Sequence, residues 1–359
     1  MNGLTIEHDL YSDYLVVNQG QATATRLSAL LEGHFSHDRL TRSLTQADYG
    51  SAQLWQLVKP FVHQVAQPDG VLVVDDSVEE KPYSQPNDLI GYHYDHTKGR
   101  SVKGLNQLTA LYHSQGTSLP VGYHLIKRTK TVPGRKGPKK VSEQTKQHLF
   151  RDLIRQAVSN HIPFEYVLAD SWYASVENIN YLINRGKKFI VALKTNRHVA
   201  LSALDNQQGQ HQPMSELDWE ETTQHRVWLA GVDTALSLTR LVFEHQDDRR
   251  GTLYLITSDL TVGAAQIEST YRLRWKVEEF YKSIKSNTGY AASPAHRVRS
   301  QSNHLFLSMV AFVKLEAIKV MTRLNHFALK AKLTQNALKH SWRQWQDYKQ
   351  ASTLLALYA

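Results

Sequence analysis

Between residues 271 and 285 the chain reads YRLRWKVEEFYKSIK, and side chains able to do chemistry recur there at intervals of three or four residues. A helix would stack residues at these intervals along one face. Such a stripe is normally apolar because it packs on the core. A carboxylate among cations instead suits a site that binds a metal ion and phosphates. The alternative interpretation is a solvent-exposed helix face with Glu–Lys pairs. The stripe consists of Tyr271, Arg274, Glu278, Lys282 and Lys285.

Two aspartates lie where short apolar runs end. Asp75 closes GVLVVD (residues 70–75), and Asp170 closes FEYVLAD (residues 164–170), each a pattern typical of a buried strand. Carboxylates at the ends of strands in one sheet can converge, and Glu278 on a nearby helix could complete the cluster. Oxygen ligands suit Mg²⁺ or Mn²⁺, and two such ions could support phosphodiester chemistry. We therefore predict that these three acids are catalytic metal ligands; the alternative for each aspartate is an ordinary turn residue.

The elements around these acids predict an α/β (α+β) fold. Three strands, a helix, a strand, a helix and a further strand form the order of a ribonuclease-H-like mixed sheet. A β-rich insertion is expected to precede the last catalytic helix. The predicted strands cover residues 70–75, 102–112, 119–126, 164–170 and 189–194, the predicted helices 143–160 and 174–185, and the insertion strands 226–229, 236–243 and 253–257.

Five regions follow from these patterns. Residues 20–65 have a helical pattern, and the helix expected after Ser36 could read DNA or could simply cover the next domain. The regions are an N-terminal helical, candidate DNA-binding region (1–68), the first part of the core (69–196), the insertion (197–262), the second part of the core (263–325) and a C-terminal helical tail (326–359).

The composition of the chain limits its possible partners, location and cofactors. The 359 residues carry a formal net charge of +9, which favours a polyanion partner. The absence of cysteine excludes disulfides and thiolate chemistry and fits a cytoplasmic protein. No apolar run is long enough to span a membrane, and no secretory signal is evident. The sequence lacks a glycine-rich phosphate motif, so ATP is not expected to be a cofactor.

The chain resembles the DDE transposases of bacterial insertion sequences, in the insertion-sequence-four group and its relatives. That group is marked by Tyr, two residues, Arg, three residues, Glu, six residues and Lys, which Tyr271, Arg274, Glu278 and Lys285 match at every spacing. Asp75-Asp76-Ser77 resembles the first-acid motif and points to Asp75, and Asp170 resembles the second acid. The resemblance runs from about residue 70 to 315.

This resemblance implies cut-and-paste transposition. A metal-dependent cut at each transposon end would release a 3′-hydroxyl, which would form a hairpin and later join target DNA. The expected requirements are two Mg²⁺ ions (or Mn²⁺) per active site, double-stranded DNA at transposon ends and target, and a homodimer in the synaptic complex. The expected location is the bacterial cytoplasm, at the nucleoid when bound to DNA. Two alternatives remain: a structure-specific nuclease of the same fold, and a DNA-binding regulator that no longer cuts.

Several further side chains are candidates for DNA contact. Residues 127–146 carry eight Lys and Arg in a stretch that Pro and Gly mark as a loop, and further cations flank Asp170 and follow residue 285. Trp275 could stack on a base, although packing is favoured because it lies off the polar stripe, and Tyr254 is a second candidate for stacking. His93, Asp95 and His96 match no standard metal site. The candidate phosphate-binding residues are Tyr271, Arg274, Lys282, Lys285, Lys136, Lys139, Lys140, Lys194, Arg197, Arg297 and Arg299.

Overall fold

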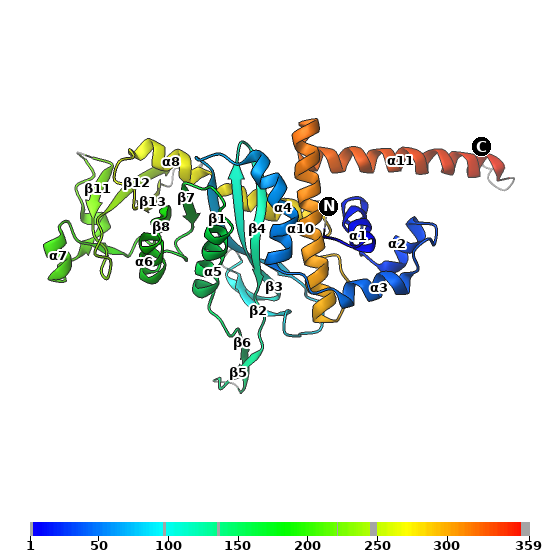
Figure 1. The fold of residues 1–359 in the computed structure, drawn as a ribbon, viewed down its shortest axis with the longest axis horizontal. Coiled ribbons are helices and arrows are strands. Elements are labelled where there is room, and N and C mark those ends of the chain that lie inside the picture. The colour runs from blue at the N-terminus through cyan, green and yellow to red at the C-terminus, as the bar shows by residue number, and fades with distance from the viewer. Residues whose placement is uncertain (1–2, 96–97, 135–136, 221, 245–249, 353–359) are drawn as a thin grey trace. The chain divides into compact units, whose positions relative to one another are not determined.

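The structure, a computed structural model, describes residues 3–95, 98–134, 137–220, 222–244 and 250–352. The chain folds into two compact units (Figure 1). One unit is Tyr49–Tyr281, and the other combines Met1–Asp48 with Lys282–Ala359. Each unit is described below by itself.

A central sheet organises the unit Tyr49–Tyr281. Its middle strand β1 pairs antiparallel with β3 and parallel with β7, β7 pairs parallel with β8, and β4 pairs antiparallel with β3. This is the predicted ribonuclease-H-like arrangement, and the α+β fold class is confirmed. The strands are β1 (Val71–Glu80), β3 (Arg100–Ser114), β4 (Thr117–Leu125), β7 (Tyr166–Ala169) and β8 (Lys188–Leu193).

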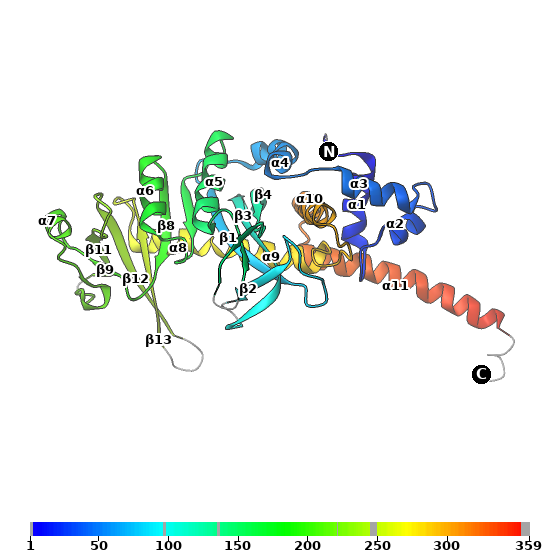
Figure 2. The ribbon, with the colours of Figure 1, turned by 90° about the horizontal axis from the view of Figure 1, so that it is seen from below.

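Helices cover both faces of this sheet, which explains why its central strands are apolar runs rather than alternating patterns. Helix α5 (Lys146–Ser159) packs on β3 and β4, and α6 (Val176–Asn184) packs on α5 and β8. On the other face lie α8 (Ala264–Arg272) and the first half of α9 (Trp275–Asn287) (Figure 2). The Tyr281 hydroxyl anchors α9 through bonds of 3.0 Å to the carbonyl oxygens of Asp75 and Gln107.

The predicted insertion contributes strands to the central sheet. Strand β13 pairs antiparallel with β8, and β12 and β11 continue the same sheet beyond it. The pairing covers an edge of β8 that would otherwise present unpaired backbone groups. These strands are β11 (Gln224–Val227), β12 (Leu236–Glu244) and β13 (Arg250–Thr257); the smaller elements between β8 and β11 are β9 (His198–Val199), α7 (Ala203–Gln207), β10 (Gln212–Pro213) and a 3₁₀ turn (Met214–Glu216).

Three further features of this unit surround the core strands. Helix α4 (Ser51–Val65) packs on β4, and strand β2 (Gly91–Asp95) ends the strand order beside β3. Strands β5 (Lys130–Val132) and β6 (Lys139–Val141) pair antiparallel, so the basic segment predicted as a loop contains a short hairpin. The prediction failed there because two three-residue strands give no periodic signal.

The second unit is helical. Helix α10 (Val298–Thr322) is buried on all sides from Ser300 to Val313, as expected for the centre of a bundle. Helices α1 (Ile6–Val17) and α3 (His37–Gln46) pack on it, and α2 (Ala24–Leu30) packs on α3. Ser36 caps α3 as predicted, since its side chain accepts the Arg39 N–H.

Helix α11 (His326–Ala351) ends the described chain and contacts α1 and α10. Helix α1 lies within the N-terminal region predicted as helical (1–68), and its buried face includes the polar residues His8 and Ser12. No helix among the described residues is long and apolar enough to cross a membrane.

Candidate active site

Asp75 lies near the middle of β1 with its carboxylate almost buried. One oxygen, Oδ1, accepts the Asp76 N–H at 2.8 Å, and the other, Oδ2, accepts Arg274 Nη1 at 3.2 Å. The same Nη1 lies 3.5 Å from Glu278 Oε1. A single guanidinium therefore joins the first and the third of the predicted acids.

Asp170 follows β7 directly. The parallel register pairs Val73 of β1 with Leu168 of β7, and two residues further along it sets Asp75 beside Asp170. The Asp170 Oδ1 accepts the Trp172 N–H at 2.9 Å, which shapes the turn after the strand. The two aspartates therefore lie on adjacent central strands. The prediction that Asp75 ends its strand is wrong, because β1 continues to Glu80 in its pairing with β3.

The electrostatics of the site are those of crowded, buried acids. Burial and then repulsion by Asp170 and Asp76 raise the pKa of Asp75 well above its usual range, and Arg274 offsets only part of this. Burial also raises the pKa of Asp170. A divalent cation would remove this repulsion, and an all-oxygen donor set is the kind that Mg²⁺ prefers. The residues present therefore fit such an ion.

Within the described residues, however, no group of three or more His, Asp or Glu side chains is already arranged around one metal position. Arg274 accounts for this, because its guanidinium occupies the space between Asp75 and Glu278. A cation held by both carboxylates would require Arg274 to turn away. We infer that Arg274 supplies the positive charge that the acids need in this state.

The helix that was predicted to carry the whole stripe is interrupted. Helix α8 ends at Arg272 and α9 begins at Trp275, with Leu273 and Arg274 in a turn between them. The prediction of one continuous helical face is therefore wrong. The turn matters because it allows the Arg274 side chain to reach back to β1. This turn could not be predicted, because neither Pro nor Gly marks it.

Three aromatic candidates have different surroundings. The Tyr271 hydroxyl is buried and donates to the Ala169 carbonyl at 3.3 Å, just before Asp170. Trp275 is 60 % exposed, so the expectation that it packs on the fold is wrong. Tyr254 is only 5 % exposed and packs beside the Trp219 ring at 5.8 Å, so its ring would have to leave the core to stack on a base.

Sequence reasoning missed a second network, centred on Asp76. Its Oδ2 accepts Lys146 Nζ at 2.6 Å and Asn106 Nδ2 at 2.9 Å, and its Oδ1 accepts the Tyr173 hydroxyl at 2.5 Å. Adjacent strand residues point to opposite faces, so Asp75 faces α9 and Asp76 faces α5. Tyr173 belongs to the turn after Asp170, and the network thereby ties that turn to β1. The only sequence signal for this network is that two aspartates, Asp75 and Asp76, are adjacent in the chain.

The candidate phosphate contacts of the unit Tyr49–Tyr281 lie in two places. Lys139 and Lys140 are exposed on β6. Lys194 follows β8 and lies 5.5 Å from the Trp172 ring, and Arg197 donates to the Ala174 carbonyl at 2.9 Å, so both flank the turn after Asp170. Lys136 lies outside the described residues.

The remaining candidates belong to the helical unit. Lys282 and Lys285 lie on the second half of α9, and the Lys282 ammonium is 5.5 Å from the Phe327 ring. Arg297 and Arg299 are exposed at the start of α10.

His93 is buried in β2, and burial together with Arg128 lowers its pKa to about 4. The side chains of Asp95 and His96, its supposed partners, lie outside the described residues.

A ribonuclease-H-like sheet with two aspartates on adjacent central strands and a glutamate on a facing helix defines a nuclease-type fold. Comparison with protein families identifies the family. The model of the DDE superfamily endonucleases matches residues 7–228, and the chain belongs to this family. The matched span includes Asp75 and Asp170 and ends before Glu278. No curated protein matches the chain. Membership makes DNA the substrate, phosphodiester cleavage the chemistry and divalent metal ions the usual cofactors.

Proposed function

We propose that the chain is a DNA transposase of the insertion-sequence-four group, which cuts transposon ends and joins them to target DNA, with a hairpin as the intermediate. The observation that carries the proposal is the convergence of Asp75, Asp170 and Glu278 around Arg274. The Tyr-Arg-Glu-Lys signature of α8 and α9 supports the choice of this group. Such an enzyme would act on DNA in the bacterial cytoplasm.

Asp75, Asp170 and Glu278 would hold two Mg²⁺ or Mn²⁺ ions. When bound, such ions activate the attacking oxygen and stabilise the leaving one in phosphodiester chemistry. The protein contributes a rigid base for this chemistry, because β1 and β7 lie in the middle of the sheet and Tyr281 fixes α9 against β1.

Arg274 would exchange partners during the reaction. Without metal ions it compensates Asp75 and Glu278, and once these acids have cations its guanidinium is available to a DNA phosphate, which accepts two parallel N–H bonds. The Tyr271 hydroxyl donates its hydrogen to the carbonyl before Asp170, so it would position the second acid; to contact a phosphate, as the sequence predicted, it would have to give up this bond. Lys282 and Lys285, further along α9, would contact the DNA backbone. Trp275, exposed beside this turn, is the better candidate for stacking on a base.

Incubation with DNA that carries the ends of its own element, in Mg²⁺, tests this function. Cut ends together with joined products support a transposase. Cuts without joining would instead support a structure-specific nuclease, and binding without cuts a regulator. A reaction without divalent metal serves as the control.

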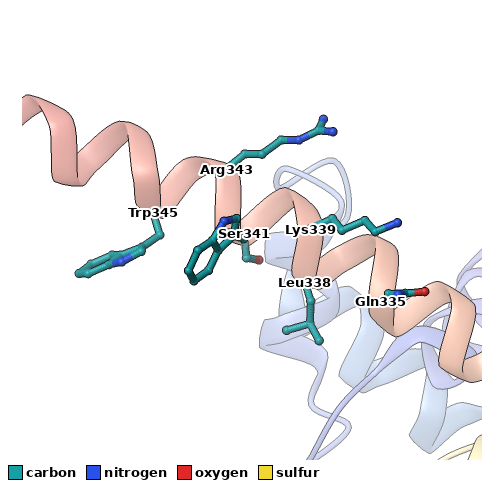
Figure 3. Close-up of a pocket in the computed structure, with 7 residues that line it drawn as sticks. Gln335, Leu338, Lys339, Ser341, Arg343 and Trp345 are labelled. Atoms are coloured by element: carbon teal, nitrogen blue, oxygen red, sulfur yellow. The ribbon is translucent and has the colours of Figure 1, made fainter.

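We also propose that two copies act together, because two ends must be joined. Helix α11 offers a surface suited to a second copy. Leu338, Trp342 and Trp345 recur at intervals of four and three residues and are 63 %, 65 % and 55 % exposed. In Figure 3 Leu338 and Trp345 point to one side of α11, and Lys339 and Arg343 point away from them. An apolar stripe of this kind is a common helix–helix contact.

The double variant Leu338→Glu/Trp342→Glu is therefore expected to abolish pairing of two chains on DNA, because it would bury unpaired charge in the contact. Light scattering of protein–DNA complexes should give two chains for the wild type and one for the variant. Asn336→Glu, exposed on the opposite side of the helix, is the matched control and should retain two chains. Two chains in the double variant would exclude α11 as the contact.

A further inference from the structure

Strand β2 presents aromatic rings to solvent. Side chains alternate along a strand, so Tyr92 and Tyr94 share one face and His93 lies on the other. Tyr92 is 62 % and Tyr94 56 % exposed, whereas His93 is buried. The buried histidine fixes the strand, and the two rings on the outer face have no part in the core.

These two rings line a groove together with cations. The groove has a volume of about 580 Å³, and its lining includes Arg128, Lys139 and Lys140. A groove that combines aromatic faces with positive charge suits a nucleic-acid strand, in which bases alternate with phosphates. Tyr92, Tyr94 and Arg128 have no role in the catalytic site described above, and Lys139 and Lys140 are two of the predicted phosphate contacts.

The groove is ordered by local hydrogen bonds. The Arg128 N–H donates to the Asp88 carbonyl at 2.7 Å, and the Arg128 guanidinium donates to the Tyr92 carbonyl. Asn87 Oδ1 accepts the N–H groups of Leu89 and Ile90 at 2.9 and 2.8 Å, which holds the turn before β2. The Arg128 guanidinium also lies 3.3 Å from His93 Nδ1, so Arg128 is held against the backbone of β2, at the end of the groove next to Gly91 and His93, before any ligand arrives.

Lys140 already has an acidic neighbour. Its Nζ lies 2.8 Å from Asp88 Oδ1, but both side chains are exposed, and such pairs contribute little. A phosphate could therefore replace Asp88 as the partner of Lys140.

The spacing of Tyr92 and Tyr94 along the strand favours an unpaired base. Residues two apart on a strand are separated by about 6.6 Å, roughly twice the 3.4 Å rise between neighbouring bases of a nucleic-acid strand. One base fits between two rings at this separation. A base inside a duplex is already stacked on both faces, so only an unpaired one could enter.

We propose that this groove binds an unpaired segment of DNA, with a base between Tyr92 and Tyr94 and phosphates on Arg128, Lys139 and Lys140. The proposal rests on the proposed function, which brings DNA with opened ends to the protein. In the β3 register Tyr94 pairs with Ser101 and Asp75 with Thr109. Eight residues of strand span about 27 Å, so the groove would hold DNA that flanks the cut rather than the cut itself.

The test measures binding of a labelled oligothymidylate and of a duplex of the same length by fluorescence anisotropy, without divalent metal. Tyr92→Ala and Tyr94→Ala should each weaken binding of the single strand by about 5–10-fold, in line with the loss of one stacked base. Both should leave duplex binding within about twofold, and Tyr92→Phe should restore single-strand binding because it keeps the ring. Tyr83→Ala is the matched control, because Tyr83 is 98 % exposed and does not line the groove.

Equal losses in Tyr83→Ala, or equal losses on the duplex, would overturn the groove as the site. Tighter binding of an RNA of matching length would overturn DNA as the occupant. Wild-type cleavage of end DNA is measured in parallel. Cleavage without single-strand binding overturns the groove alone, and single-strand binding without cleavage overturns the proposed function alone.

Discussion

Asp75→Asn is expected to lower the rate of DNA cleavage by about 10³-fold, because a metal that stabilises the transition state contributes several kcal/mol. The same change should not lower the stability of the fold. Burial and the neighbouring acids raise the pKa of Asp75. When folding raises the pKa of a carboxyl, the folded state becomes less stable as the pH rises through the pKa of the folded state. At neutral pH the neutral amide removes this cost. Cleavage of end DNA and urea unfolding at pH 7 measure the two effects.

Asp76→Asn is the matched control for this prediction, since it changes the neighbouring residue in the same way. Asp76 is paired with Lys146 and accepts two further hydrogen bonds, so loss of its charge should reduce the free energy of unfolding by about 1–2 kcal/mol. If Asp75→Asn lowers cleavage without lowering stability, and Asp76→Asn lowers stability, then Asp75 is the metal ligand and Asp76 the structural acid. A loss of stability in Asp75→Asn as large as that in Asp76→Asn would contradict this distinction.

Asp259→Asn is expected to reduce the free energy of unfolding at pH 7 by about 1–2 kcal/mol, because the donors around this buried side chain lose their charged acceptor. Asp259 is 6 % exposed, and its carboxylate accepts Lys188 Nζ at 2.7 Å, the Tyr166 hydroxyl at 2.8 Å and the Thr261 hydroxyl at 2.6 Å. These bonds join β7, β8 and the turn after β13.

The pH dependence of this effect has a definite sign. Burial alone raises the pKa of Asp259, but the bonds from Lys188, Thr261 and Tyr166 outweigh it and hold that pKa well below the usual range. The stabilisation is therefore present above the unfolded value of about 4 and is lost as the pH falls below it. Urea unfolding of both proteins at pH 7 and pH 3 should show the difference shrinking at pH 3. A constant difference would argue against an ionic origin.

The sequence was sufficient to predict those structural features that depend on residues close together in the chain. Apolar runs that end in Asp75 and Asp170 predicted two neighbouring strands of one sheet, because burial on both faces demands such runs. The order of the elements then predicted the ribonuclease-H-like core. Ser36 as the N-cap of α3 was equally readable, since the capping bond involves residues three apart.

Features that depend on distant partners could not be predicted. The strands of residues 224–257 were recognised, but nothing in them shows that β13 pairs with β8. The role of Arg274 between Asp75 and Glu278 depends on a turn that no residue type marks. Tyr254 remained a candidate for base stacking, because the sequence does not show that its ring packs against Trp219, in the turn before β11.

Glu278, which lies beyond the matched part of the family, is proposed to complete the catalytic acids. The most direct test of this proposal compares the wild type with Glu278→Gln on DNA carrying the element's ends, with binding and cutting measured in the same Mg²⁺ buffer. Gln keeps the size of the side chain and removes its charge. We predict DNA binding equal to that of the wild type and no detectable cutting. Cutting at the wild-type rate would contradict the assignment of Glu278 as a metal ligand.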